Sequence, residues 1–182
     1  MFNTSISNNS ELDSKNLEDL SAHSRVIWSY DNYGDGLVMS TSFGIQSAVL
    51  LHLTTLKIPQ IPVVFIDTGY LFKETYDFAN ELCDRLKLNL KVYKPLISKQ
   101  ELESKYGNLW EKGITGLEKY NRICKVEPMN RAIKELNAKA WISGLRRDQS
   151  KSRKGLSVIE KQNKVLKIYP IIDWDDQTIY RY

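Results

Sequence analysis

The chain has 182 residues, of which 42% are hydrophobic and 26% charged, and its formal net charge is +4. This composition is typical of a globular protein with one sizeable core. No apolar run reaches the ~18 residues needed to cross a bilayer, and the N-terminus is polar, so we expect no membrane span, no signal peptide and a cytoplasmic location. The few thiols and imidazoles, Cys83, Cys124, His23 and His52, argue against a disulfide framework or a zinc site.

The N-terminal part of the chain divides into two segments. Residues 1–15 are rich in Ser and Asn and lack periodicity, so we predict a flexible arm there and a single domain over residues 16–182. Apolar spacing predicts an amphipathic helix over residues 16–29. The turn-forming residues 31–36 are expected to end it.

Short apolar runs then alternate with segments of helical periodicity. Strands are predicted at residues 37–40, 61–66, 88–93 and 140–143, and helices at residues 45–56, 73–86 and 127–136, with Pro128 in the first turn of the last helix. Residues 98–118, broken by three glycines, are predicted to be an irregular excursion at the sheet edge. This alternation predicts a three-layer α/β/α fold with a mainly parallel, twisted sheet.

The C-terminal part has a different pattern. Residues 156–160 and 165–168 flank a polar tetrapeptide and predict a β-hairpin. Asp175 and Asp176 are helix-capping residues ahead of a predicted helix over residues 177–182. Because a helix this short is marginal by itself, we expect the sequence to end inside an element, as a fragment of a longer protein would.

Polar segments follow three of the predicted strands, at residues 40–47, 67–72 and 144–153. In an open α/β sheet, ligands bind beyond the carboxyl ends of the strands. The first segment runs directly into a helix, where backbone N–H groups and the helix dipole favour an anion such as phosphate. An ordinary Ser/Thr-rich turn with a helix cap is the alternative. The signatures GxxxxGK[ST] and GxGxxG are absent, which sets aside P-loop kinases and dinucleotide dehydrogenases.

The third segment is strongly basic. Five cations fall within nine residues, namely Arg146, Arg147, Lys151, Arg153 and Lys154. Such a run predicts an anionic ligand, with a solvated basic loop as the alternative. The aromatic residues do not interleave with these cations, so we do not predict nucleic-acid binding.

Several motifs carry a family resemblance. The loop from Ser42 to Ser47, SFGIQS, resembles the SGGxDS loop of the adenine nucleotide alpha hydrolases, with Gln46 where those enzymes place an Asp. The strings STSFGIQSAVLLHL, IDTGYLFKETYDFANEL, KYNRICKVEPMNRAIKELNA, WISGLRRDQSKSR and KIYPIIDWDDQTIYRY are similar, in this order, to the 3′-phosphoadenylyl-sulfate (PAPS) reductase family. An enzyme that splits ATP needs acidic help with Mg²⁺, whereas a protein that holds a nucleotide during attack at sulfur does not.

The resemblance implies an adenine nucleotide alpha hydrolase-like fold and a role in assimilatory sulfate reduction. PAPS would be reduced to sulfite and adenosine 3′,5′-bisphosphate, with thioredoxin or glutaredoxin as electron donor. Matched by position, the first loop would contact the phosphosulfate or ribose, the second segment would line the adenosine pocket, and the basic set would surround the 3′-phosphate and sulfate. The implied substrate-binding residues are Ser40, Ser42, Gly44, Gln46, Ile66, Asp67, Thr68, Lys125, Gly144, Arg146, Arg147, Gln149, Ser150 and Arg153.

The resemblance also bears on the cysteines. The family nucleophile is a Cys in a KRECGLHE-like tail, and nothing similar precedes Tyr182, so we expect binding without turnover. Related adenylyl-sulfate reductases ligate an iron–sulfur cluster through a Cys-Cys pair. In this sequence the matching positions are Tyr120 and Asn121, which cannot replace those thiolate ligands. The resemblance therefore implies that no cluster and no other cofactor are bound. Cys124 lies beside that pair, and Cys83 is interpreted as a core residue.

Two other functions remain open at this point. One is an ATP-dependent adenylyltransferase of the same fold, which Gln46 disfavours, and the other is a non-catalytic nucleotide-binding homologue. The oligomeric state is left open, with a homodimer among the alternatives.

Overall fold

The computed structural model describes residues 16–162 and 165–182. The predicted arm, residues 1–15, and the tip of the predicted hairpin, residues 163–164, lie outside these ranges.

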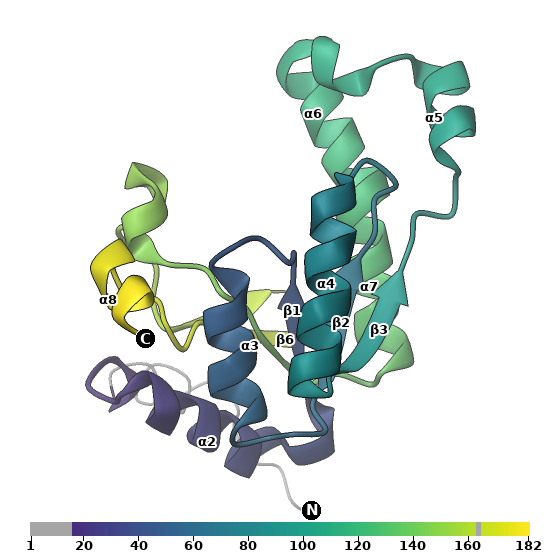
Figure 1. The fold of residues 1–182 in the computed structure, drawn as a ribbon. Helices are drawn as coiled ribbons and strands as arrows, with labels where there is room; N and C mark the ends of the chain where they lie inside the picture. The colour runs from purple at the N-terminus through teal and green to yellow at the C-terminus, as the bar shows by residue number, and fades with distance from the viewer. Residues whose placement is uncertain (1–15, 163–164) are drawn as a thin grey trace, which may run out of the picture.

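A six-stranded sheet forms the centre of the protein (Figure 1). Its strands are β1 (Leu37–Thr41), β2 (Pro62–Ile66), β3 (Asn89–Tyr93), β4 (Ala140–Ile142), β5 (Ile159–Gln162) and β6 (Val165–Ile168). They lie in the order β3-β2-β1-β4-β6-β5, and every pairing is parallel except that of β5 with β6. The predicted mainly parallel sheet is confirmed.

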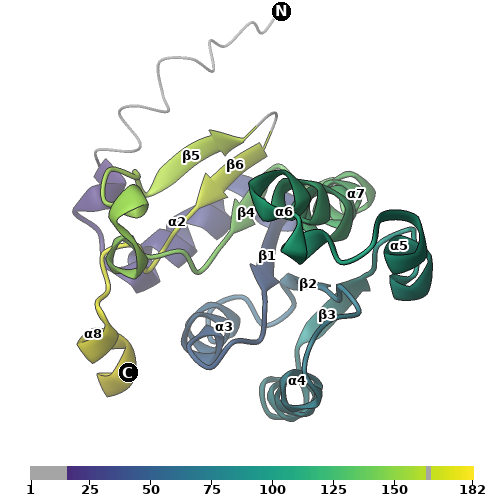
Figure 2. The same cartoon turned by 90° about the horizontal axis from the view of Figure 1, so that it is seen from above.

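Helices cover both faces of the sheet, as predicted, and they lie on opposite sides of it in Figure 2. The helices are α2 (Ala22–Tyr33), α3 (Ser47–Thr55), α4 (Lys73–Leu86), α5 (Lys99–Tyr106), α6 (Gly113–Asn121), α7 (Glu127–Glu135) and α8 (Asp176–Arg181). The main core lies between one face and helices α2, α3 and α4. On the other face, Met129 and Ala132 of α7 pack on Val64 of β2. Burying both faces explains why the central strands are apolar runs rather than alternating ones.

The strand order places a switch point between β1 and β4. From β1 the chain builds β2 and β3 on one side, and then returns to form β4 on the other side of β1. The connections on the two sides therefore diverge above the carboxyl ends of these two strands, which leaves a crevice there.

Helix α2 is displaced along the chain relative to the predicted helix over residues 16–29, because it begins only at Ala22. It runs to Tyr33, through residues that we expected to form a turn. Ser21 caps its start by accepting a hydrogen bond from the Ser24 N–H, and the Asn32 side chain donates to the Trp28 carbonyl at 2.8 Å, which keeps that residue helical. The helix ends at Gly34, whose φ of +48° favours glycine.

The prediction of an irregular excursion over residues 98–118 is wrong, because helices α5 and α6 occupy most of it. Ser98 starts α5 with a capping box, in which its side chain and that of Glu101 bond each other's backbone N–H. Gly116 is needed for a close approach rather than for a turn, since a Cβ there would lie 2.0 Å from the Leu109 carbonyl oxygen. Gly116 therefore permits close packing of two backbones within helix α6 and does not break the helix.

Helices α6 and α7 form one continuous rod, joined by a π-helical turn, Arg122–Val126. Within this turn the N–H of Glu127 bonds the carbonyl of Arg122, five residues earlier. Pro128 follows directly, and a proline inside a helix lacks the N–H and crowds the carbonyl four residues back. The wider turn accommodates the proline. Pro128 lies in the first turn of α7, as predicted, although this turn continues the rod instead of starting a separate helix.

The C-terminal elements agree with the predictions in kind. Strands β5 and β6 pair antiparallel, although Lys161 and Gln162 extend β5 instead of forming the turn. The side chain of Asp175 caps α8 by accepting from the Thr178 N–H at 2.7 Å. Asp176 has a different role, described below.

A buried arginine attaches α2 to the segment that precedes α8. The Arg25 side chain is fully buried and forms a two-point ion pair with Asp173, at 2.7 and 2.9 Å. It also donates to the backbone carbonyls of Leu17, Glu18 and Pro170. This pairing fixes residues 170–173, which lead into the site.

Candidate functional site

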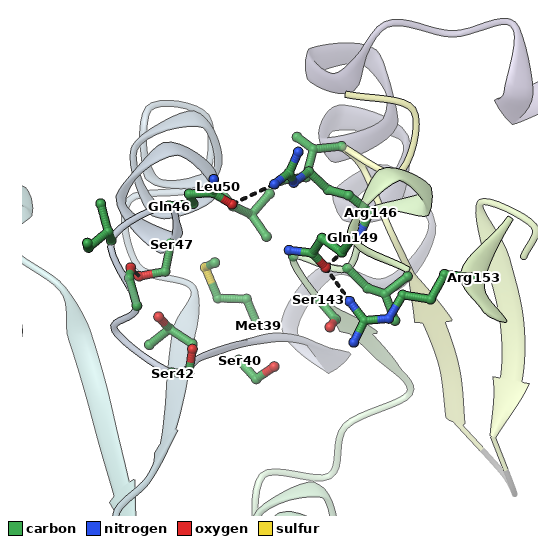
Figure 3. A pocket seen from close by; sticks show the side chains of 16 residues that line it. Met39, Ser40, Ser42, Gln46, Ser47, Leu50, Ser143, Arg146, Gln149 and Arg153 are labelled. Carbon is green, nitrogen blue, oxygen red and sulfur yellow. Dashed lines mark hydrogen bonds between the residues drawn. The ribbon is translucent and has the colours of Figure 1, made fainter. Parts of the chain in front are cut away.

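A cavity of about 820 Å³ lies at the switch point, above the carboxyl ends of β1 and β4 (Figure 3). It is bounded by the loop between β1 and α3, by the start of α3 and by the segment after β4. Its lining residues are Met39, Ser40, Thr41, Ser42, Gly44, Ile45, Gln46, Ser47, Leu50, Ser143, Gly144, Leu145, Arg146, Gln149, Arg153 and Ile171. The cavity is therefore where this fold class binds ligands.

The β1–α3 loop, residues 42–46, is held by one buried aromatic side chain. Phe43 is 2% exposed, has a φ of +50°, and packs edge-on against Phe65 with ring centroids 4.9 Å apart. Its N–H donates to the Thr41 hydroxyl at 3.1 Å. A bulky residue with positive φ is uncommon and is maintained by the surrounding packing. Burying Phe43 turns Ser42 and Gly44 towards the cavity.

The loop delivers the start of α3 to the cavity. Ser47 donates from both its N–H and its hydroxyl to the Gly44 carbonyl, at 2.8 and 2.6 Å. Gln46, at the N-cap position, makes no side-chain capping bond. Apart from that of Ser47, the N–H groups of the first helical turn receive no side-chain cap from Gln46, and they face an anion site in the field of the helix dipole.

Arg146 lies across the cavity from this helix start and is 2% exposed. Its guanidinium donates to Gln46 Oε1 at 2.5 Å, to Asp176 Oδ1 at 2.7 Å and to the Trp174 carbonyl at 3.1 Å. The hydrogen bond from Arg146, with one from Gln46, holds the pKa of Asp176 below its usual value. Arg146 is therefore fixed in position, with the carboxylate of α8 as its counter-ion.

A second cation, Arg153, stands on the same wall (Figure 3). The Gln149 side-chain oxygen accepts from its guanidinium and, at 3.3 Å, from the Arg146 N–H. Two short 3₁₀ turns, Arg147–Gln149 and Lys151–Arg153, place both residues. The cavity thus combines two guanidiniums with hydroxyls and a helix N-terminus, a combination that suits tetrahedral oxyanions.

Eight of the fourteen predicted substrate-binding residues line the cavity. They are Ser40, Ser42, Gly44, Gln46, Gly144, Arg146, Gln149 and Arg153. Segments separated by about 100 residues in sequence therefore meet, as the strand-end argument predicts.

Two predicted residues of the basic loop lie elsewhere. Arg147 forms an ion pair with Glu18 at 2.6 Å and donates to the Leu156 carbonyl at 2.8 Å, so it links the loop to the N-terminal helical residues. Ser150 lies beyond the cavity, and its hydroxyl is 3.0 Å from that of Ser152.

The residues at the end of β2 form a neighbouring network instead of lining the cavity. Asp67 is 7% exposed and accepts from the Tyr76 hydroxyl at 2.6 Å and the Gly69 N–H at 3.0 Å, with Lys94 at 3.4 Å. Burial raises the pKa of Asp67, but these donors outweigh burial and the pKa lies below its usual value. Thr68 is also buried, and Ile66 packs beside the α7 cluster.

Lys125 lies outside the cavity as well. It is exposed on the π-helical turn, with its ammonium 5.7 Å from the centre of the Tyr120 ring. Tyr120 packs edge-on against Tyr70 and Trp110, so the predicted match to a Cys-Cys pair falls in an aromatic cluster.

The list of individually predicted residues omits half of the lining, although Thr41, Ile45, Ser47 and Leu145 lie within the predicted polar segments. The missed residues are Met39, Thr41, Ile45, Ser47, Leu50, Ser143, Leu145 and Ile171. Ser143 had a usable signal, because it directly follows a strand that pairs with β1. Ile171 had none, since tertiary contacts bring its segment to the cavity, among them the hydrogen bonds from Arg25 to the Pro170 carbonyl and from the Arg147 N–H to the Ile172 carbonyl.

Neither cysteine lies at the cavity. Cys83 is on α4 and packs against the main core, as predicted, while Cys124 is 1% exposed in the cluster under α5 and α6. Burial raises the pKa of both thiols. Over residues 16–162 and 165–182, no group of three or more His, Cys, Asp or Glu side chains is placed to hold a metal ion. Within the same ranges, no helix has the length and hydrophobicity to span a membrane.

Comparison with known proteins identifies the family. The family described as "Phosphoadenosine phosphosulfate reductase domain" matches residues 36–182. The chain belongs to this family. A phosphoadenosine 5′-phosphosulfate reductase of Cronobacter sakazakii is 58% identical over 166 residues, which cover 91% of this chain and 68% of that protein, and an Escherichia coli relative of the same name matches equally.

Solved structures agree with this assignment to the PAPS reductase family. The structure of a PAPS reductase from Candida auris, in a phosphate complex, superposes with a TM-score of 0.81 at 30% identity, covering all of this chain and 87% of that one. Yeast FAD synthetase in complex with FAD has a TM-score of 0.61 at 16% identity, covering 99% of this chain and 60% of that one, and so shares the fold alone.

Proposed function

We propose that this protein acts in the reduction of 3′-phosphoadenylyl sulfate to sulfite and adenosine 3′,5′-bisphosphate, and that the cavity binds the nucleotide. The observation that carries the proposal is the start of α3 facing Arg146 across a cavity at the switch point. Membership of the PAPS reductase family supports it. Thioredoxin or glutaredoxin would be the electron donor and protein partner.

The proposed reaction transfers a sulfonate group. A thiolate attacks the sulfur of PAPS, a sulfur–sulfur bond forms, and the bond from sulfur to the bridging oxygen breaks. The electron pair of that bond leaves with the oxygen, which gives adenosine 3′,5′-bisphosphate and a protein-bound thiosulfonate. A dithiol then releases sulfite and is oxidised to a disulfide. Negative charge thus develops on the 5′-phosphate.

The cavity is suited to receive that charge. Backbone N–H groups at the start of α3 and the guanidinium of Arg146 provide fixed donors for the phosphate oxygens. Because Gln46 and Asp176 already hold Arg146 in place, little reorganisation is needed when the substrate binds. Positioning and electrostatic stabilisation are the contributions that we assign to these residues.

The thiol is a separate matter. Cys83 and Cys124 are both removed from the cavity and both have a raised pKa, so neither is a suitable thiolate donor. We therefore propose that the 182-residue chain alone binds the nucleotide without turnover. Sulfite release by this chain with PAPS and reduced thioredoxin would contradict that proposal.

The proposed substrate contacts are the eight predicted residues that line the cavity. Ile66, Asp67, Thr68, Lys125, Arg147 and Ser150 lie outside it and are not included. Gln46 supports a nucleotide-holding role over an ATP-splitting one, because its neutral side chain bonds Arg146 and offers no carboxylate to a magnesium ion.

Calorimetric titration of the chain with adenosine 3′,5′-bisphosphate tests the assignment of the cavity. We expect Arg146→Ala to weaken binding by about tenfold to a hundredfold, because a charge-assisted contact is lost. Arg85→Ala is the matched control, since Arg85 is an exposed residue of α4 whose ion pair with Glu81 lies away from the cavity. Unchanged affinity in Arg146→Ala, or an equal loss in both variants, would overturn the proposal.

A further inference from the structure

Two of the proposed substrate contacts, Gln149 and Arg153, lie in the tip of the loop between β4 and β5, residues 148–155 (Figure 3). None of the tip residues is buried, and most of them are exposed. An exposed segment gains little fixed position from core packing. The place of the tip at the cavity wall therefore depends on how the base of the loop is held.

A single carboxylate joins the two sides of the loop at its base. Glu18 Oε1 accepts from Arg147 Nη2 at 2.6 Å and from the Val158 N–H at 3.0 Å. Arg147 Nε also donates to the Leu156 carbonyl at 2.8 Å, so the guanidinium spans the base of the loop. The side chains of Glu18 and Arg147 are only 34% and 28% exposed, which favours a stronger pair than an exposed one. We call these four residues the clasp.

Glu18 is itself anchored to the core. The preceding residue, Leu17, is 1% exposed and belongs to the main core. The buried Arg25 side chain donates to the carbonyls of both residues, each at 2.9 Å. Glu18 also precedes residues 36–182, the part of the chain that the family model matches. The clasp thus joins an anchored N-terminal segment to a loop of the matched part.

We propose that Glu18 is a positioning residue for the nucleotide site, because it fixes the base of the loop and thereby holds Gln149 and Arg153 at the cavity wall. Arg146 has its own partners across the cavity, so Glu18 acts on the tip of the loop. This inference rests on the proposed function and adds a residue that does not line the cavity.

Positioning and simple electrostatics predict opposite effects of removing this carboxylate. A negative charge near an anion site opposes binding, so its loss strengthens binding if charge alone matters. If Glu18 positions the loop, its loss weakens binding although a repulsive charge has gone, because the donors of the tip are no longer preorganised.

Calorimetric titration of the chain with adenosine 3′,5′-bisphosphate is the test. Glu18→Ala should weaken binding by about threefold to tenfold. Asp19→Ala removes the adjacent exposed carboxylate and is the matched control for charge; it should bind at least as tightly as the original chain. Glu18→Gln keeps an acceptor oxygen for the Val158 N–H and should recover part of the loss. In the Arg153→Ala background, adding Glu18→Ala should change affinity by less than about twofold.

Unchanged or tighter binding by folded Glu18→Ala overturns the inference and leaves the proposed function intact, even if the thermal unfolding midpoint falls, because the clasp is then structural only. An undiminished effect of Glu18→Ala in the Arg153→Ala background also overturns it. If Glu18→Ala does not fold, Arg147→Lys breaks the clasp with the charge retained, since an ammonium cannot reproduce the two-sided guanidinium contact. Unchanged affinity in that variant overturns the inference. Absence of binding by the unsubstituted chain overturns both proposals.

Discussion

Replacing Arg25 by Met is expected to destabilise the fold strongly. The substitution removes a fully buried guanidinium that serves both carboxylate oxygens of Asp173 and three backbone carbonyls. Breaking a buried ion pair by removing one partner costs about 3–5 kcal/mol. The Asp173 side chain is 45% exposed and can recover some hydration, so the lower end of this energy range applies to the loss of its ion pair. The three backbone carbonyls that lose their donor add to the cost.

In a chain of this size, a loss of about 1 kcal/mol in the free energy of unfolding lowers the thermal unfolding midpoint by about 2–4 °C. Thermal unfolding followed by circular dichroism should therefore show a midpoint lower by something on the order of 10 °C. The double variant Arg25→Met/Asp173→Leu should recover part of the loss, because no charge is then left unpaired. Arg85→Met, which breaks only an exposed pair, should stay within about 2 °C of the original chain. An Arg25→Met midpoint within that same margin would refute the reasoning.

Three further outcomes are expected. Gly116→Ala should lower the unfolding midpoint and loosen α5 and α6 in hydrogen exchange, since its Cβ would meet the Leu109 carbonyl; an unchanged midpoint would contradict this. The pKa of Asp67 is lowered on folding, so the ionised carboxylate stabilises the fold above pH ~4, and this stabilisation is lost as the pH falls through the pKa of the folded state. The difference in thermal unfolding midpoint between the original chain and Asp67→Asn should therefore shrink on acidification rather than grow. Asp176→Asn should raise affinity for adenosine 3′,5′-bisphosphate by roughly two- to threefold in calorimetry, because a carboxylate no longer competes for Arg146, and weaker binding would be the opposite result.

The fold could be predicted where local signals and tertiary packing agree. Helix α4 has the predicted bounds, Lys73–Leu86, because its apolar residues repeat at helical spacing and all pack on one side. The segment around Gly116 fails because glycine has two opposite uses, to break a helix or to let another backbone come close. Only the tertiary contact with Leu109 distinguishes them.

The candidate site was predictable at the level of loops but not of single side chains. Arg146 and Arg147 are adjacent and equally basic, yet one is buried across from Gln46 and the other faces Glu18. The backbone changes from an extended residue to a 3₁₀ turn between them, which sends their side chains in different directions.

The most direct test of the central claim is a crystal structure of the chain with adenosine 3′,5′-bisphosphate. We predict the 5′-phosphate at the start of α3, within hydrogen-bond distance of the β1–α3 loop and Arg146, in the cavity between β1 and β4. A nucleotide bound at any other surface, with this cavity empty, would contradict the account.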